Sequence, residues 1–119
     1  MHTKETCQKA MLAVRDTLDI VGGKWKLVLI VTLMSGKRRF LELVRETGIT
    51  PRILSKELQE MEINGLLTRT VLDTRPITVE YELTPYSLSL KDVLGAMEKW
   101  GTQHRKKIIG GSKAAGKVK

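Results

Sequence analysis

The chain has 119 residues, of which 41% are hydrophobic, and this is the size and composition of one globular domain with a real core. A formal net charge of +8 favours a polyanionic partner, because each phosphate that Lys or Arg neutralises releases a condensed counterion. The single cysteine, Cys7, excludes an internal disulfide and a thiolate cluster for a structural metal, and it suits a reducing cytoplasm.

Two apolar patterns in the first third of the chain predict helices. The first helix is expected over about residues 8–19, and Gly22 and Gly23 break it. The run from Lys24 to Met34 is nearly all apolar after Lys26, which is typical of a central helix that is buried on most sides. Apolar residues recur at helical spacing in the first of these helices at Met11, Leu12, Val14, Leu18 and Ile20.

Residues 38–64 are predicted to form two short helices that are joined by a tight turn. The first helix buries an apolar side and reaches Gly48, a residue that tolerates the left-handed conformation at a helix end. Thr50 is placed to cap the second helix, and Pro51 suits the first helical position because its missing N–H would be unpaired there anyway. This pattern predicts a helix-turn-helix motif, which is a common reader of duplex DNA.

The second motif helix is predicted to have one buried and one outward face. Leu54, Leu58 and Met61 form an apolar stripe on the helical wheel. The outward side chains suit a major groove, since Arg and Lys pair with guanine, Gln pairs with adenine, and Ser bonds several acceptors or a phosphate. A face exposed only to solvent would carry similar residues, so both interpretations stay open at this point. The outward residues are Arg52, Lys56 and Gln59, with Ser55 at their edge.

Two extended runs over about residues 67–83 predict a β-hairpin, or wing, with residues 73–76 at its tip. Arg69 and Arg75 are then expected to contact phosphate, or else only to solubilise the hairpin. Lys37, Arg38 and Arg39 precede the first motif helix, where a clamp on the DNA backbone would be useful. We expect at least one of these three residues to pack or pair internally instead.

A last helix is expected over about residues 85–108, after the capping pair Thr84 and Pro85. Its apolar residues could pack on their own domain or, with those of the first helix, on a second copy of the chain. Residues 110–119 are expected to be a disordered basic tail. The prediction is an α+β, mainly helical fold over residues 1–109, a winged helix-turn-helix with N- and C-terminal dimerisation helices. The candidate interface residues are Met11, Leu12, Leu18, Leu90, Leu94, Met97 and Trp100.

Several spaced motifs resemble the HxlR-type transcriptional regulators of the MarR-like winged-helix group. The resemblance implies a homodimeric DNA-binding regulator whose terminal helices form the dimer interface. It also implies that Cys7 occupies a position where many members carry a cysteine, which senses oxidants or electrophiles in some of them. Ser87, where the family often has glycine, and Met61, where leucine is common, depart from the pattern. The matching segments are Gly22 to Trp25, Arg39-Phe40, Glu42-Leu43, Gly48 to Thr50, Leu54, Leu58, Asn64 to Leu66, Arg69 and Val79 to Thr84.

The sequence offers little for catalysis. His2 and His104 lie at opposite ends of the chain, no metal-ligand spacing is present, and nucleophile elbows and phosphate-binding loops are missing. No apolar run is long enough to cross a bilayer. We therefore expect a soluble, cytoplasmic protein that is not an enzyme, needs no cofactor and has no membrane partner.

The predicted function is sequence-specific regulation of transcription by a homodimer on a pseudo-palindromic operator, with half-site centres about 34–36 Å apart. Cys7 is either a sensing thiol, favoured by nearby Lys4 and Lys9 and opposed by Glu5, or only a structural residue in a regulator that responds to a small molecule. A non-specific architectural DNA-binding protein and a protein-interaction domain remain as alternatives. The operator, the sign of regulation and any effector stay open.

Overall fold

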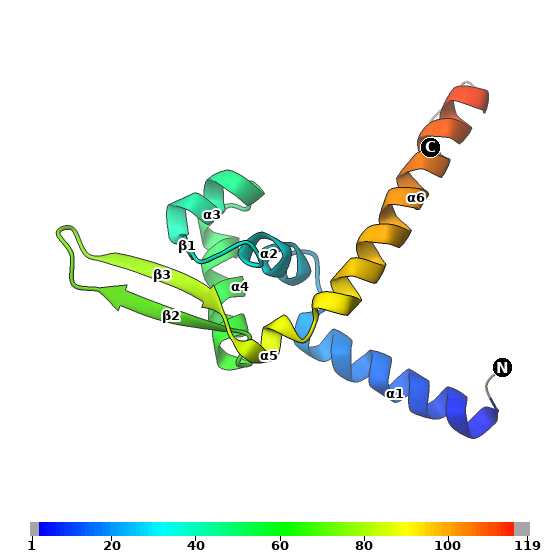
Figure 1. Cartoon of the computed structure of the whole chain (residues 1–119), viewed down its shortest axis with the longest axis horizontal. Helices are drawn as coiled ribbons and strands as arrows, with labels where there is room; N and C mark the ends of the chain where they lie inside the picture. The colour runs from blue at the N-terminus through cyan, green and yellow to red at the C-terminus, as the bar shows by residue number, and fades with distance from the viewer. Residues whose placement is uncertain (1–2, 116–119) are drawn as a thin grey trace. The chain divides into compact units, whose positions relative to one another are not determined.

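The computed structural model describes the backbone of residues 3–115 and the side chains of residues 3–110. It separates into two compact units, so the single domain expected over residues 1–109 is divided after Leu88. The second unit contains one helix, α6 (Lys91–Ala115). The first contains α1 (Lys4–Val21), α2 (Lys26–Leu33), β1 (Arg38–Arg39), α3 (Phe40–Thr47), α4 (Pro51–Ile63), β2 (Leu67–Leu72), β3 (Thr78–Leu83) and α5 (Pro85–Leu88), as Figure 1 shows.

Helices α3 and α4 and the turn between them form the predicted helix-turn-helix. Gly48 ends α3 with φ of 73°, in the left-handed region, and its N–H donates to the carbonyl of Val44 at 2.9 Å. Pro51 occupies the first turn of α4, as predicted. The side chain of Thr50, however, makes no capping hydrogen bond. The hydroxyl of Thr47 accepts from the N–H of buried Ile49 instead, at 3.2 Å, and so stabilises the turn.

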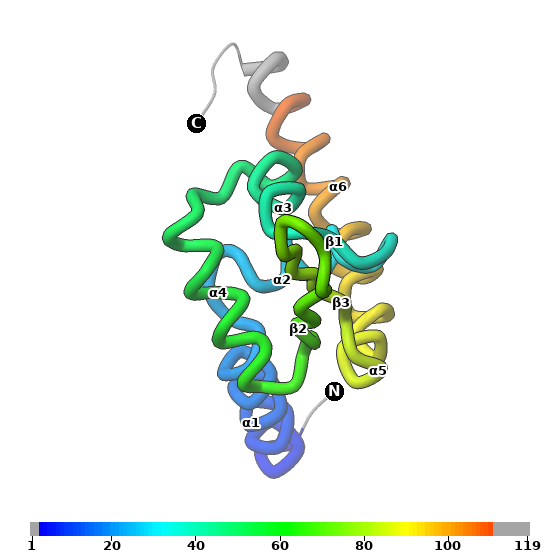
Figure 2. Tube along the Cα trace, turned by 90° about the vertical axis from the view of Figure 1, so that its left-hand side faces the viewer, coloured from blue at the N-terminus to red at the C-terminus, as the bar shows by residue number. Residues whose placement is uncertain are grey.

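Strands β2 and β3 form the predicted hairpin, with antiparallel pairs from Leu67 opposite Leu83 to Leu72 opposite Thr78. Strand β1 pairs with the other edge of β3, so the sheet order is β1-β3-β2. The sequence did not predict β1, because two residues carry no strand periodicity. The free end of the hairpin extends away from α3 and α4 in Figure 1, while α4 runs beside β2 in Figure 2.

The core of the first unit lies between α2, α3, α4 and the base of the sheet. As predicted, α2 is central: Leu29 and Ile30 have no exposed surface. Leu43 from α3 and Leu66 from the start of the wing are equally buried. This core fixes the positions of the two motif helices and of the wing.

The C-terminal part of the chain differs from the prediction. The helix expected over residues 85–108 is two helices, α5 and α6, which are separated by a turn at Ser89 and Leu90. The break follows a short helix that side chains tie in place: Thr84 Oγ1 donates to the carbonyl of Gly65 at 2.7 Å and accepts from the N–H of Ser87 at 3.2 Å.

Helix α6 continues to Ala115, into residues 110–115 that were expected to be disordered. Lys113, Ala114 and Ala115 are good helix formers and favour this extension, although Gly110 and Gly111 oppose it. The last residues of the expected tail, 116–119, lie outside the described residues. Helix α1 is also longer than expected, because Thr3 caps it by accepting from the N–H of Thr6 at 3.1 Å. Among the described residues, no helix has the length and apolar character that a membrane span requires.

Candidate nucleic-acid interface

Helix α4 has the two faces that the helical wheel predicted. Leu54, Leu58 and Met61 are at most 2% exposed and hold the helix against the core. The outward side chains are all exposed to solvent: Arg52, Ser55, Lys56 and Gln59. The chain therefore presents two cations, a hydroxyl and an amide on one accessible helix face, a set of groups that fits base edges and phosphates.

A buried lysine on α2 binds the side of α4 that faces the core. Lys26 on α2 is 8% exposed, and its ammonium nitrogen lies 2.7 Å from Oε1 of Glu57 and 2.7 Å from Oε1 of Glu60. Burial opposes the charge of Lys26, but the hydrogen bonds and the attraction of the two carboxylates outweigh it, so the pKa of Lys26 is raised. The hydrogen bond to Lys26 in turn lowers the pKa of Glu60.

Sequence reasoning missed this ion triad. A lysine at the start of an apolar helix, together with two glutamates three positions apart on another helix, was the available signal. The triad restrains rotation of α4 about its own axis, because both carboxylates lie on the side of the helix that faces α2. The direction of the outward face is thereby fixed by the protein before any partner binds.

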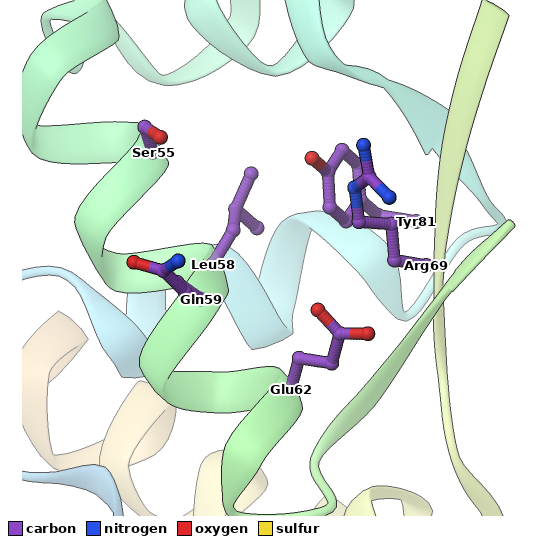
Figure 3. Close-up of a pocket in the computed structure, with 6 residues that line it drawn as sticks. All are labelled: Ser55, Leu58, Gln59, Glu62, Arg69 and Tyr81. Carbon is purple, nitrogen blue, oxygen red and sulfur yellow. The ribbon is translucent and has the colours of Figure 1, made fainter. Parts of the chain in front are cut away.

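A groove of about 340 Å³ lies between α4 and the wing. We call it the wing groove, and Figure 3 shows its lining residues. Its floor includes Tyr81, which is 8% exposed. Arg69 is paired with Tyr81 across the β2–β3 ladder, so the two side chains lie on the same face of the sheet. The lining residues are Ser55, Leu58, Gln59, Glu62, Arg69 and Tyr81.

The basic residues of the outward face and of the wing keep their charges available. Arg75 is exposed at the tip of the hairpin, and Arg69 is exposed on β2. Within residues 3–110, none of Arg52, Lys56, Arg69 and Arg75 makes an ion pair. Their exposed charges are therefore available to a polyanion, although Lys56 also attracts the nearby carboxylate of Glu60.

The basic run before α3 is used differently. The guanidinium of Arg38 bonds Glu46 at 3.0 Å, the carbonyl of Gly36 at 2.7 Å and the hydroxyl of Ser35 at 2.7 Å. The expectation that at least one of the three basic residues pairs internally is therefore confirmed, and the geometry favours a structural role for Arg38 over a clamp on DNA. Lys37 lies 3.6 Å from Glu80, but its side chain stays 59% exposed.

Comparison with known proteins decides the family. Residues 20–108 match the profile of the HxlR-like helix-turn-helix proteins. The chain belongs to the HxlR-like helix-turn-helix family. It is 38% identical over 104 residues to the HTH-type transcriptional regulator YtcD of Bacillus subtilis, covering 87% of this chain and 82% of YtcD. It is 41% identical over 96 residues to the regulator YdeP of the same organism, covering 80% of this chain and 75% of YdeP.

Solved structures agree with this assignment. The chain superposes on the reduced form of the redox regulator HypR with a TM-score of 0.76 and 37% identity, covering 82% of this chain and 98% of HypR. The fold is thus the winged helix of the family, and the relatives with which this HxlR-like chain compares are named as regulators of transcription. These findings confirm the predicted fold class and the resemblance.

The expected interface residues of this HxlR-like protein are accessible in the single chain. On α1 only Val21 is buried, whereas Met11, Leu12 and Leu18 are each more than half exposed. On α6, Met97 and Trp100 are exposed and Leu94 is half-buried, and Leu90, in the turn before α6, is also half-buried. Cys7 is exposed on α1 as a free thiol. In the part of the chain that the structure describes, no three histidine, cysteine, aspartate or glutamate side chains lie close enough together to hold a metal ion.

Proposed function

We propose that this HxlR-like regulator binds duplex DNA sequence-specifically, with the outward face of α4 in the major groove and the wing along the neighbouring backbone or minor groove. One observation carries the proposal: the outward face of α4 bears unpaired cations beside Ser55 and Gln59, while the Lys26 triad holds the opposite side of the helix to the core. A reading face with a fixed direction is what direct recognition of base edges requires.

The proposal includes a homodimer on a pseudo-palindromic operator in the cytoplasm. The apolar side chains of α1 and α6 support it, because a chain of this size gains stability by covering so many exposed apolar residues with a second copy. Two linked copies would read two half-sites about one helical turn apart, roughly 34–36 Å. No cofactor is part of the proposal, and an effector remains to be identified.

The proposal can be tested by letting the purified protein select the fragments that it binds from a random-sequence duplex library. We expect an enriched inverted repeat whose complex survives an excess of random duplex at fixed salt. Enrichment of no motif, with equal affinity for every fragment, would instead support a non-specific architectural protein. An absence of binding at moderate salt would support a protein-interaction domain.

We further propose that oxidation of Cys7 controls this binding. The support is the exposed free thiol of Cys7 and the similarity to HypR, which is named as a redox regulator. Because the chain has one cysteine, an oxidised form would be a disulfide between two subunits or with a small thiol. Treatment with diamide should change the affinity of the wild type for the selected operator and leave Cys7→Ser unaffected. An equal response of both proteins would make Cys7 only structural.

A further inference from the structure

Tyr81 is the residue from which a more specific inference starts. Its ring belongs to the buried core, since the whole residue is only 8% exposed. Within residues 3–110 its hydroxyl has no hydrogen-bond partner, yet no side-chain oxygen or nitrogen in this part of the chain is both buried and unpartnered. The hydroxyl is therefore open to the wing groove, which Tyr81 lines.

This arrangement makes Tyr81 a pre-organised hydrogen-bond donor. A tyrosine held by its packed ring loses little conformational freedom when its hydroxyl binds a ligand. Phenolic hydroxyls donate well to anionic oxygens. The groove thus already holds one donor in place, and the ligand that completes it must bring an acceptor.

Arg69 supplies charge beside this donor. It lies opposite Tyr81 in the register of β2 and β3, and Figure 3 shows the two side chains next to each other at the wing side of the groove. Its guanidinium makes no ion pair among the described residues, although Glu62 lines the same groove. A planar guanidinium next to a hydroxyl donor is suited to the oxygens of a phosphate group.

The place of the groove in the fold indicates which phosphate it would meet. When a recognition helix lies in the major groove and the wing follows the adjacent minor groove, the strand of backbone that separates these two grooves passes between helix and wing. The wing groove lies between α4 and the β2–β3 hairpin. A backbone phosphate is the ligand with the right chemistry at this position.

We propose that the wing groove seats one phosphodiester phosphate of the bound DNA, with the Tyr81 hydroxyl and the Arg69 guanidinium as its ligands. The proposal rests on the proposed function. Ser55 and Glu62 line the α4 wall seven residues apart, which is about 10 Å along a helix, so the Glu62 carboxylate repels phosphate from one end of the groove. This repulsion confines the phosphate to the end of the groove near Ser55.

Tyr81→Phe tests this proposed phosphate site, because the substitution removes the hydroxyl oxygen and keeps the packed ring. Binding to the selected operator and to a random duplex should weaken about equally, by about tenfold, since a phosphate contact carries no sequence information. The slope of affinity against salt should stay unchanged for Tyr81→Phe and become shallower for Arg69→Gln. The chain's other tyrosine gives the matched control, Tyr86→Phe, which should bind like the wild type. Thermal unfolding of each variant checks that the fold is kept.

Single methylphosphonates, which remove the charge of one phosphate, locate the contact. We expect one position in each half-site at which the neutral phosphate weakens the wild type and has a much smaller effect on Arg69→Gln, which no longer has a charge to pair with that phosphate. Glu62→Gln should strengthen binding to both duplexes. Wild-type affinity of Tyr81→Phe, or the same methylphosphonate profile for the wild type and Arg69→Gln, overturns the proposed phosphate site and leaves the proposed function standing. If the wild type prefers no sequence but Tyr81→Phe still binds random duplex more weakly, the proposed function is overturned and the phosphate site is kept.

Discussion

The ammonium nitrogen of Lys26 on α2 lies 2.7 Å from Oε1 of Glu57 on α4, at a position where both side chains are largely shielded from solvent. This contact joins the most buried helix of the domain to the helix that we propose reads DNA. Because a charged pair at low exposure interacts more strongly than one in bulk water, it stabilises one orientation of α4. The same contact therefore contributes to the stability of the fold and to the orientation of the outward face of α4.

Replacement of Lys26 by methionine should destabilise the protein by about 1–3 kcal/mol, because the unbranched apolar side chain keeps most of the packing but leaves two carboxylates without their cation. Urea unfolding monitored by circular dichroism measures this change. Lys24→Met is the control, since Lys24 is exposed and loses only its contact with the ring of Trp25. Equal losses of stability in the two variants would show that the triad contributes no more than a surface lysine.

The pH dependence of stability should report the same triad. The hydrogen bond to Lys26 holds the pKa of Glu60 below its ordinary value of 4.5, so this carboxylate stabilises the fold above pH 4.5 and loses that effect as the pH falls through the lowered pKa. The stabilisation from charged Lys26 persists over this range, because its pKa is raised above 10.5. That stabilisation is lost only as the pH rises through the raised pKa.

We therefore expect the wild type to lose stability more steeply than Glu60→Gln as the pH falls from about 6 to about 3. The urea midpoint of both proteins, measured at each pH, gives the comparison. Parallel curves for the two proteins would mean that Glu60 does not depend on Lys26 for its charged state.

Much of this architecture could be predicted from local signals. Gly48, Pro51 and the apolar stripe of α4 identified the motif helices, and two extended runs around the turn at residues 73–76 identified the wing, because caps, turns and periodicity act over a few residues. What could not be predicted are relationships across the fold. Lys26 and Glu57 are 31 positions apart, and strand β1 exists only because β3 is beside it.

The same limit applies to Arg38 and Tyr81. A basic residue before a motif helix looked like a clamp on DNA, but the carboxylate of Glu46 is close enough to engage it. Tyr81 looked like an ordinary strand residue, since only the packed sheet buries its ring and leaves its hydroxyl at the groove. In both cases, the side chain's role is set by neighbours that folding brings near.

Ser87 should contribute to stability as a bridge between α5 and the wing. It is fully buried, and its hydroxyl donates a short hydrogen bond to the carbonyl of Leu66. Ser87→Ala should cost about 1 kcal/mol, because the carbonyl keeps a second donor, the N–H of Thr84 at 3.1 Å. Ser87→Gly should cost more, since glycine adds backbone freedom in a helix. Thermal unfolding distinguishes the two, and an unchanged midpoint for both would refute the bridge.

The outward face and the wing should respond differently to truncation. Arg52→Ala or Gln59→Ala should each cost about 1–3 kcal/mol of operator affinity and relax the preference at one base position. Arg75→Ala should weaken operator and random duplex alike and make the salt dependence shallower, as loss of a phosphate contact does. Affinity titrations on the selected operator, its single-base variants and random duplex measure these effects. Equal losses on all duplexes for Arg52→Ala and Gln59→Ala would contradict a base-reading role.

Dimerisation should depend on the apolar faces of α1 and α6. Leu12→Glu on α1 and Met97→Glu on α6 place a charge where both side chains are at least half exposed in the single chain, so neither should unfold its helix. If these faces meet a second copy, burying the new charge would weaken the dimer at least tenfold, and operator affinity would fall with it. Ile77→Glu, at another exposed apolar residue, on the wing, is the control and should leave the association unchanged. Sedimentation velocity over a range of concentrations measures the equilibrium. A wild type that stays monomeric on its operator, or variants that associate like the wild type, would place the interface elsewhere.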